Sequence, residues 1–239
     1  LSIIQGVGYA NPNRSHFESI DIWHTCRRKT AVRTDGWLGR YLEANQSGQA
    51  LDLPAIHLGH EKQPLALSSQ SIRVPSVKSL DRFRLKDQSK KLSEAVTRIG
   101  GTTSSGDDLL GFVQSSTGSA LSASQQIEAA SGNYKPGITY PDSGLAQKLK
   151  TVAQLIDSGL KTRIYYVTLD GFDTHSRQAP AHAALLRELS GALESFVTDL
   201  NEHGHGDRVL TMSFSEFGRR LKENASEGTD HGAAAPVFL

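Results

Sequence analysis

The chain has 239 residues, of which 37% are hydrophobic and 21% are charged. This balance supports a packed core and excludes wholesale disorder, and the length suits one large domain or two small ones. A formal net charge of +1 gives no electrostatic reason to expect nucleic acid as the main partner. The single cysteine, Cys26, cannot form an intrachain disulfide and fits either a reducing or an oxidising compartment.

Neither a membrane span nor an export signal is recognisable. No apolar stretch approaches the roughly 18–20 residues that a membrane helix needs, so no transmembrane segment is predicted, and no signal peptide is visible. Residues 1–4 already have the character of a buried strand, and residues 236–239 are also strand-like. We therefore expect one domain over residues 1–239 that is truncated at both ends.

The first sixty residues contain four predicted elements. The apolar run at 1–7 predicts a strand. Ser15 and Glu18 have the S-x-x-E spacing of a capping box, so a helix is expected to start at Ser15. A second, short helix is predicted over 36–42, and a strand over 53–58.

Between about residues 60 and 140 the periodic patterns weaken. Gly, Ser, Thr and Gln are frequent there, and residues 100–106 form a glycine- and serine-rich stretch typical of a loop. Residues 85–99 and 109–130 have helical character. We interpret the whole stretch as a helical or loop insertion, or cap, on the domain.

The last hundred residues alternate between helix and strand patterns. Helices are predicted over 142–158 and 181–203, and strands rich in β-formers over 162–169 and 208–214. This alternation predicts crossover connections and a mostly parallel sheet, hence an α/β fold. We expect the strands at 1–7, 162–169 and 208–214 to share that sheet.

Three polar clusters border the predicted strands. Their sequences are GFDTH at 171–175, SEFGR at 215–219 and GTDHG at 228–232. Carboxylates and imidazoles are the ligands of hydrolytic Zn²⁺ or Mn²⁺ sites. Clusters that follow parallel strands meet at one sheet edge. Each also has a structural interpretation: Asp173 can brace a turn, while Glu216 and Arg219 can form a surface ion pair.

The order of these motifs resembles a known bacterial family. The three clusters, with the H-x-x-L-L pattern at 182–186, resemble the C-terminal signature of the DUF1501 family. Its N-terminal half is similar to NRSHF at 13–17, DIWHT at 21–25 and GWLGRYL at 36–42. The resemblance covers both ends of the chain, and it places the chain in the alkaline-phosphatase-like, or sulfatase-like, superfamily.

The resemblance implies a fold and a metal site. The fold would be a three-layer α/β sandwich around a mostly parallel sheet. Active members hold two divalent metals, here expected to be zinc or manganese. Asp173 and His175 would bind one metal, and Asp230 and His231 the other. His182 is an alternative ligand, or an anchor on its helix.

The resemblance also implies catalytic residues, namely Ser15, Glu216 and Arg219. Ser15 follows a strand and a turn and stands at a helix N-terminus, where the helix dipole and free N–H groups favour a phosphate or sulfate. It is therefore the expected nucleophile, with a plain N-cap as the alternative. Glu216 would act as a further ligand or a base.

Two functions from different classes follow. The first is a metal-dependent hydrolase acting on a small anionic ester of phosphate or sulfate. The second is a non-catalytic binding or envelope protein that retains the fold. The family usually carries an export signal, which implies a periplasmic or extracellular location. Its remaining metal ligands, an Asp and a His, would lie outside residues 1–239, so the chain as given is expected to be inactive.

Overall fold

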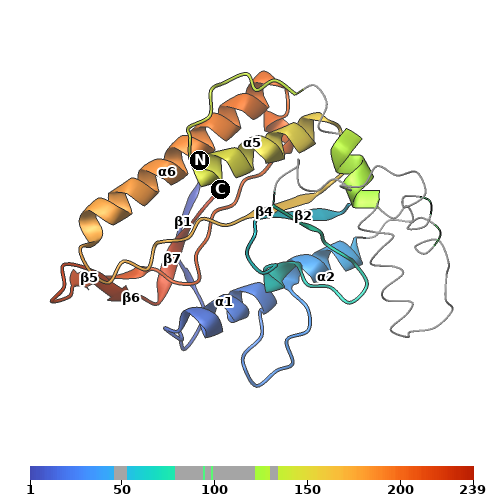
Figure 1. Ribbon diagram of the computed structural model, residues 1–239. Helices are drawn as coiled ribbons and strands as arrows, with labels where there is room; N and C mark the ends of the chain where they lie inside the picture. Colours follow the sequence, from blue (N-terminus) through green and yellow to red (C-terminus); the bar gives the residue numbers. More distant parts are fainter. Residues whose placement is uncertain (46–52, 79–93, 95–97, 99–121, 130–133) are drawn as a thin grey trace.

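A computed structural model describes residues 1–45, 53–78, 94, 98, 122–129 and 134–239 (Figure 1). The described residues form a mixed α/β protein. None of its described helices combines the length and the apolar character that a membrane span requires. The elements, in chain order, are β1 (Ile3–Gly8), α1 (His16–Thr25), α2 (Trp37–Ala44), β2 (Ala55–Leu58), η1 (Leu65–Leu67), β3 (Ser76–Val77), α5 (Gly144–Asp157), β4 (Ile164–Val167), α6 (Gln178–Glu202), η3 (Gly206–Arg208), β5 (Arg219–Glu223), β6 (Thr229–His231) and β7 (Ala234–Phe238).

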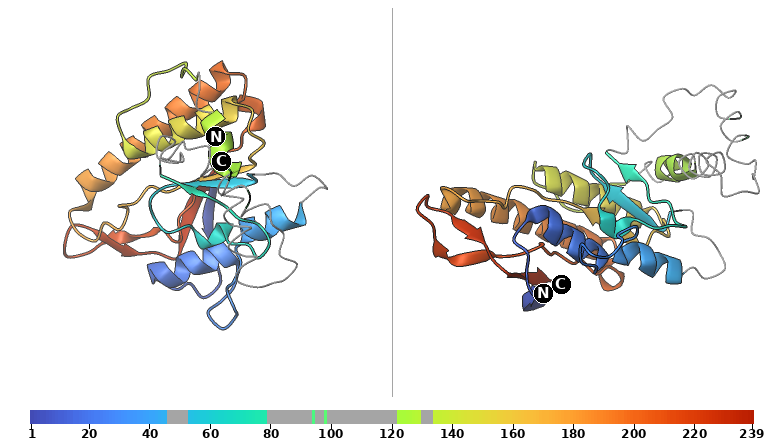
Figure 2. Two further views of the ribbon diagram at one scale, coloured as in Figure 1. Left: turned by 45° about the vertical axis from the view of Figure 1, so that its right-hand side comes forward. Right: turned by 90° about the horizontal axis from the view of Figure 1, so that it is seen from below.

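The centre of the fold is a parallel sheet of three strands in the order β3-β2-β4. Helices α5 and α6 lie on one side of this sheet, and α1 and α2 lie on the other (Figures 1 and 2). Successive side chains of a strand point to opposite faces. Ile56 and Leu58 of β2 accordingly pack in the core beneath α5 and α6, whereas Ala55 packs in a separate core with Leu42 of α2.

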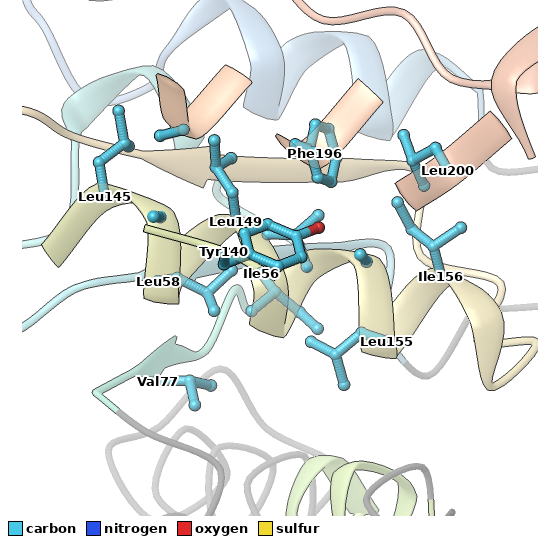
Figure 3. Packing of buried hydrophobic residues seen from close by; sticks show 14 of the residues in the cluster. Ile56, Leu58, Val77, Tyr140, Leu145, Leu149, Leu155, Ile156, Phe196 and Leu200 are labelled. Carbon is cyan, nitrogen blue, oxygen red and sulfur yellow. The ribbon is translucent and has the colours of Figure 1, made fainter. Parts of the chain in front are cut away.

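The larger core joins α5, α6 and the sheet (Figure 3). Helix α5 presents Leu145, Leu149, Val152 and Ile156 at the spacing of one helix face, and all four are buried. Phe196 of α6 packs in the same cluster. Each such side chain contributes about 1.5–3 kcal/mol by leaving water. This packing provides the rigid frame on which the loop after β4 rests.

Much of the predicted fold is confirmed. The expected helices at 142–158 and 181–203 correspond to α5 and α6, and the strands at 53–58 and 162–169 to β2 and β4. The parallel pairing of β2 with β4 confirms a parallel sheet. Long periodic patterns and β-rich runs therefore located the central elements correctly.

The prediction that three distant strands share one sheet is wrong. β1 pairs antiparallel with β7 in a separate two-stranded sheet. Residues 208–214 contain one isolated bridge, between Ser213 and Phe238, and no other strand pairing. The 208–214 segment meets the other edge of β7 only at Ser213, and Leu210 stays 78% exposed. The apolar character of 208–214 is thus not matched by burial.

The stretch at 60–140 is described in part. Strand β3 lies within it and belongs to the sheet. Residues 122–129 are helical, as expected for the predicted helix at 109–130, and Ala123 and Ile127 join the larger core. The rest of that helix, the 100–106 stretch and nearly all of 85–99 lie outside the described residues. An insertion or cap here remains a prediction.

Helix α1 starts where predicted but without the expected capping box. Ser15 occupies the N-cap position in an extended conformation, and its side chain makes no capping hydrogen bond. Glu18 instead binds Arg33, whose guanidinium donates to both carboxylate oxygens at 2.5 and 3.0 Å. A bidentate ion pair outcompetes a backbone N–H for this carboxylate. The Ser15 hydroxyl is therefore left uncommitted to the helix.

Candidate metal centre

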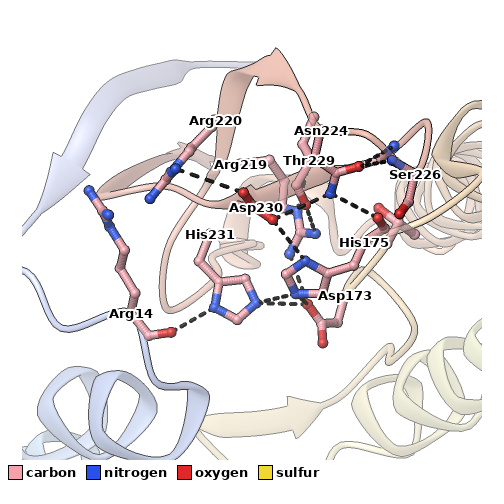
Figure 4. A network of polar contacts seen from close by, with 12 residues as sticks. Arg14, Asp173, His175, Arg219, Arg220, Asn224, Ser226, Thr229, Asp230 and His231 are labelled. Carbon is pink, nitrogen blue, oxygen red and sulfur yellow. Dashed lines mark hydrogen bonds and ion pairs between the residues drawn. The ribbon is translucent and has the colours of Figure 1, made fainter.

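Three parts of the chain meet at one site. The start of α1 supplies His16. The loop after β4 supplies Asp173 and His175, and the β5–β6 hairpin supplies Arg219 and His231 (Figure 4). The hairpin docks against the loop through backbone hydrogen bonds. Arg177 N donates to Ser226 O at 3.0 Å, and Gln178 N donates to Glu227 O at 2.8 Å.

Gly228 makes this docking close. A Cβ built on Gly228 would lie 2.2 Å from the backbone carbon and oxygen of His175. Any larger residue would push the hairpin away from the loop. Asn224 also fixes the contact, because its side-chain amide donates to His175 O at 2.9 Å. The loop and the hairpin therefore hold their histidines at a set separation.

Four side chains converge on a single carboxylate oxygen, Oδ1 of Asp173. The Nε2 atoms of His231 and His175 lie 2.8 and 2.9 Å from it. Nη1 of Arg219 donates to it at 2.8 Å, and Nε2 of His16 is 3.2 Å away. His175 Nε2 and His231 Nε2 are also only 2.8 Å apart. Three imidazoles thus present the same ring nitrogen to one point.

The Nε2 atom of His16 is the clearest sign that this arrangement could hold a metal ion. It is buried, yet it makes no aligned hydrogen bond with any residue that the structure describes. Its distance to Asp173 would allow a hydrogen bond, but the alignment does not. The donor atoms of His16, Asp173 and His231 all lie within 4.8 Å of one another, a grouping that can hold a metal ion.

The opposite ring nitrogen of each histidine is held from outside. His16 Nδ1 lies 2.6 Å from Glu216 Oε1, and His231 Nδ1 lies 2.6 Å from the carbonyl oxygen of Arg14. His175 Nδ1 lies 3.4 Å from Asp230 Oδ1. A metal-ligating histidine characteristically donates its other N–H to a carboxylate or carbonyl, which fixes the ring orientation. All three rings have such a partner.

An aromatic floor supports two of the rings. Phe217, 6% exposed, stacks on His231 with centroids 4.5 Å apart and tilts against His16 at 4.8 Å. Trp23 of α1 donates its indole N–H to Glu216 O at 2.8 Å. These contacts hold the SEFGR segment beneath the histidines.

The electrostatics favour a negative Asp173 and a positive charge beside it. Burial alone would raise the pKa of Asp173. Hydrogen bonds from His231 and Arg219, together with the positive charge of the nearby His16, instead hold the pKa of Asp173 well below its usual range. Burial opposes protonation of His16, yet contacts with Glu216 and Asp173, and their charges, raise its pKa. Asp173 is therefore held as an anion, which is the form in which a carboxylate can bind a cation.

The donor set fits a divalent metal ion. Imidazole nitrogens and a carboxylate oxygen are the ligands of hydrolytic zinc, and they also suit other transition metals. The site is open, because the side chains of His16, His175 and Asp173 are 37%, 43% and 48% exposed. The residues present could thus hold an ion and leave a position for another molecule.

The predicted ligands do not all take equivalent places. Asp173, His175 and His231 converge, as expected. Asp230 stands behind His175, and its Oδ1 accepts from Asn224 Nδ2 at 3.3 Å. His182 contacts the ring of Phe172 at 5.9 Å and makes no described contact with the centre.

Of the predicted catalytic residues, two contact the ligands of the centre, and the third, Ser15, lies next to it in sequence. Glu216 orients His16, and Arg219 binds Asp173. Ser15 is exposed and lies in sequence between Arg14 and His16, both of which contact the centre.

Sequence reasoning missed His16. The residue lies inside the NRSHF segment at 13–17, next to the predicted nucleophile, but no periodicity or spacing distinguished it. The signal available was its position just after a strand and a turn, the same argument that selected Ser15. Its partner Glu216 was predicted, although not as the residue that orients a histidine.

Fold and site together define a mixed α/β protein with a candidate metal centre at the meeting point of three chain segments. The chain belongs to the family described as "Protein of unknown function (DUF1501)", whose profile matches residues 7–239. No curated protein and no solved structure matches the chain. The predicted family membership is confirmed.

Proposed function

We propose that the protein binds a divalent metal ion, zinc or manganese, and hydrolyses a small anionic ester of phosphate or sulfate at that site. One observation carries the proposal: three Nε2 atoms lie against one carboxylate oxygen while the Nδ1 atoms are held by outside acceptors. A bound ion would polarise the ester and stabilise the charge that develops on it. The proposed ligands are His16, Asp173, His175 and His231.

The exposure of the site supports a catalytic role over a structural one. A structural zinc site is closed to other molecules, whereas a catalytic site keeps a coordination position open; with four protein ligands, that position would be a fifth one, which zinc can accept. Here Asp173 and His175 are nearly half exposed, while His231 is 15% exposed. The proposed ligands thus leave one side of the centre exposed to solvent, where a small ester could bind.

Each predicted catalytic residue has a role in this proposal. Glu216 holds the ring of His16 through Nδ1, so that Nε2 faces the centre. Arg219 places a fixed positive charge beside Asp173, where it can attract an anionic substrate. Ser15, whose hydroxyl is not used for capping, is the proposed nucleophile. Its oxygen would attack the phosphorus or sulfur of the ester, the bond to the alcohol oxygen would break, and the alcohol would leave with the proton of the serine hydroxyl. Water would then hydrolyse the serine ester and restore the free hydroxyl.

The wider family assignment is part of the same proposal. Helices on both faces of a parallel sheet are compatible with the three-layer sandwich of the alkaline-phosphatase-like superfamily (Figure 1). A periplasmic or extracellular location rests on the family resemblance. Cell fractionation with an antibody to the protein would test that location directly.

Metal content and turnover, both measured on the full-length protein, test the function together. We expect the purified protein to retain zinc or manganese and His16→Ala to lose it, while the control His182→Ala keeps it. An aryl phosphate and an aryl sulfate serve as substrates. Metal binding without turnover would favour the non-catalytic alternative. A wild-type protein that takes up neither metal refutes the proposal.

Ser15 needs a separate test. Ser15→Ala should remove most turnover and change stability by less than the about 0.5–2 kcal/mol of an ordinary N-cap, because no capping bond is lost. Ser15→Asp keeps a good capping side chain but places a negative charge near the anion. Near-normal turnover by Ser15→Asp would show that the nucleophile is another group.

A further inference from the structure

We infer that the centre holds one divalent cation rather than two, and that the guanidinium of Arg219 takes the place of the second. This inference rests on the proposed metal site and departs from the two-metal arrangement that the family resemblance implies. It assigns a function to the contact between Arg219 and Asp173.

The guanidinium of Arg219 is held independently of Asp173. Its Nε donates to Thr229 Oγ1 at 3.2 Å, and its Nη2 donates to Thr229 O. The β5–β6 pairing places Arg219 directly opposite His231. Two of its three nitrogens are thus fixed by the hairpin, and the third, Nη1, points at Asp173 Oδ1. The side chain is 17% exposed, so this charge cannot swing freely into solvent.

Within residues 1–239, the predicted site carboxylates that a second ion could use are already engaged. Ions of a two-metal site lie about 3.5–4 Å apart and require further acidic ligands. Asp230 accepts from Asn224 and His175 through Oδ1, and its Oδ2 lies 3.8 Å from Arg220. Glu216 accepts from Ser215 at 2.8 Å and holds His16. Of the three predicted site carboxylates, only Asp173 therefore faces the centre.

The charge of the site follows from this arrangement. One divalent cation with three neutral imidazoles, one carboxylate and one guanidinium leaves the centre net positive. A small dianion would balance that charge without any second ion. Arg219 would thus supply the positive charge for anion binding that a second metal ion supplies in two-metal sites, and the β5–β6 hairpin already fixes the position of that charge.

The same geometry makes Arg219 a competitor of the metal. Its Nη1 lies 2.8 Å from the oxygen that the ion must share, and two positive charges a few ångströms apart repel each other. Removing the guanidinium should therefore strengthen metal binding while it weakens anion binding. A residue that only stabilises the fold would not produce opposite changes in the two affinities.

Arg219→Gln tests the inference, with Lys222→Gln as a control that removes a positive charge from an exposed position in β5. Bound metal is counted by elemental analysis, and Zn²⁺ affinity is measured by calorimetry. Inorganic phosphate is then titrated into protein loaded with one equivalent of zinc. We expect one ion per wild-type chain, zinc binding at least about tenfold tighter in Arg219→Gln, and phosphate binding weaker by a similar factor. Lys222→Gln should resemble wild type.

Two results would overturn the inference while leaving the proposed function intact. They are two ions per wild-type chain, or zinc binding in Arg219→Gln that is no tighter than in wild type. The absence of zinc from wild type and both variants would remove the proposed function as well. Arg219→Lys, which keeps the charge, covers the case in which Arg219→Gln fails to fold; zinc affinity close to wild type in this variant supports the inference, and a large gain contradicts it.

Discussion

Two aspartates of this protein each gather several donors, and they do so in opposite ways. Asp199 of α6 is fully buried, and its donors are spread over both oxygens: Tyr134 and Tyr140 donate to Oδ2, the latter at 2.7 Å, and Gly137 N donates to Oδ1 at 2.9 Å. Asp173 is half exposed, and its donors crowd onto one oxygen.

The difference separates a structural carboxylate from a ligand. Two hydroxyls, a backbone amide and the ring of His203, whose Nδ1 lies 3.2 Å from Oδ1, satisfy Asp199, and three of these contacts tie the 134–140 segment to α6. The three imidazole nitrogens around Asp173 share one acceptor, and neutral imidazoles would point their lone pairs at the same place. A cation at that place could bind all of them together with the carboxylate, and burial alone does not reveal such a site.

The comparison between Asp173 and Asp199 is tested most strongly by replacing Asp173, for which we expect the largest effect, a loss of metal binding. Asp173→Asn should reduce Zn²⁺ affinity by more than about 100-fold, since it removes the charged oxygen on which the donors converge. Calorimetric titration measures the change. Asp170→Asn, an exposed position in the same loop, is the control. Equal zinc affinity in Asp173→Asn and wild type would exclude Asp173 as a ligand.

Asp199→Ala should lower the stability of the protein and leave zinc binding unchanged, the reverse of the effect expected for Asp173→Asn. Tyr134, Tyr140 and Gly137 would lose their acceptor inside the core, so we expect the free energy of unfolding to fall by about 3 kcal/mol. Urea denaturation measures this loss, and Glu194→Ala, exposed on the same helix, is the control. Zinc affinity should not change. A drop in zinc affinity comparable to that of Asp173→Asn would contradict the division between the two aspartates.

Glu216 sharpens the comparison, because it acts on the centre through His16. Glu216→Gln should weaken zinc binding by about 10–100-fold, the usual effect of losing the partner of a metal-ligating histidine. Asp230→Asn should have a smaller effect, since its contact with His175 is longer, at 3.4 Å, and half exposed. Competition titration with a chromogenic chelator can rank the two. The opposite ranking would mean that His16 is not held by Glu216 in the way described.

Asp35, like Asp199, is a structural carboxylate, and replacing it should have the smallest effect on stability. A hydrogen bond from Arg40 lowers the pKa of Asp35 below its ordinary 3.8. Burial acts in the opposite direction, but further hydrogen bonds from Arg27 and Thr34 also lower this pKa. A lowered folded-state pKa contributes stability above the unfolded value, which is lost as pH falls through the folded value. Asp35→Asn should thus cost about 1–2 kcal/mol near neutral pH.

That cost should shrink below about pH 3.8, as Asp35 of the wild-type protein becomes protonated. Thermal unfolding of both proteins across the acid range measures the difference. A cost that stays constant down to the most acidic pH would show that Asp35 is not held as an ion pair.

Local patterns predicted the frame and most of the site. The spacing of Leu145, Leu149 and Ile156 was enough to place α5, because a helix with one apolar face has few alternatives. Asp173, His175 and His231 were found because they follow strands or lie between glycines. The pairing of β1 with β7 was not predicted, since partner choice depends on long-range packing that a single strand's pattern does not contain.

His16 and the S-x-x-E pattern show the same limit at the level of side chains. Glu18 has the right spacing for a capping box, but Arg33 competes for it from fifteen positions away. His16 has no local feature that marks it as a ligand. Its function depends on Glu216 and Asp173, which approach it only in the folded chain.

The hydrogen bond between His231 and Arg14 joins positions 217 residues apart. During synthesis on the ribosome, His16 emerges long before His231 of β6, so the ligand set stays incomplete until β6 has been made. Bringing such distant segments together is entropically costly and slow. Metal loading would consequently follow the synthesis of β6, and a shorter nascent chain would lack the complete centre that could capture the wrong ion.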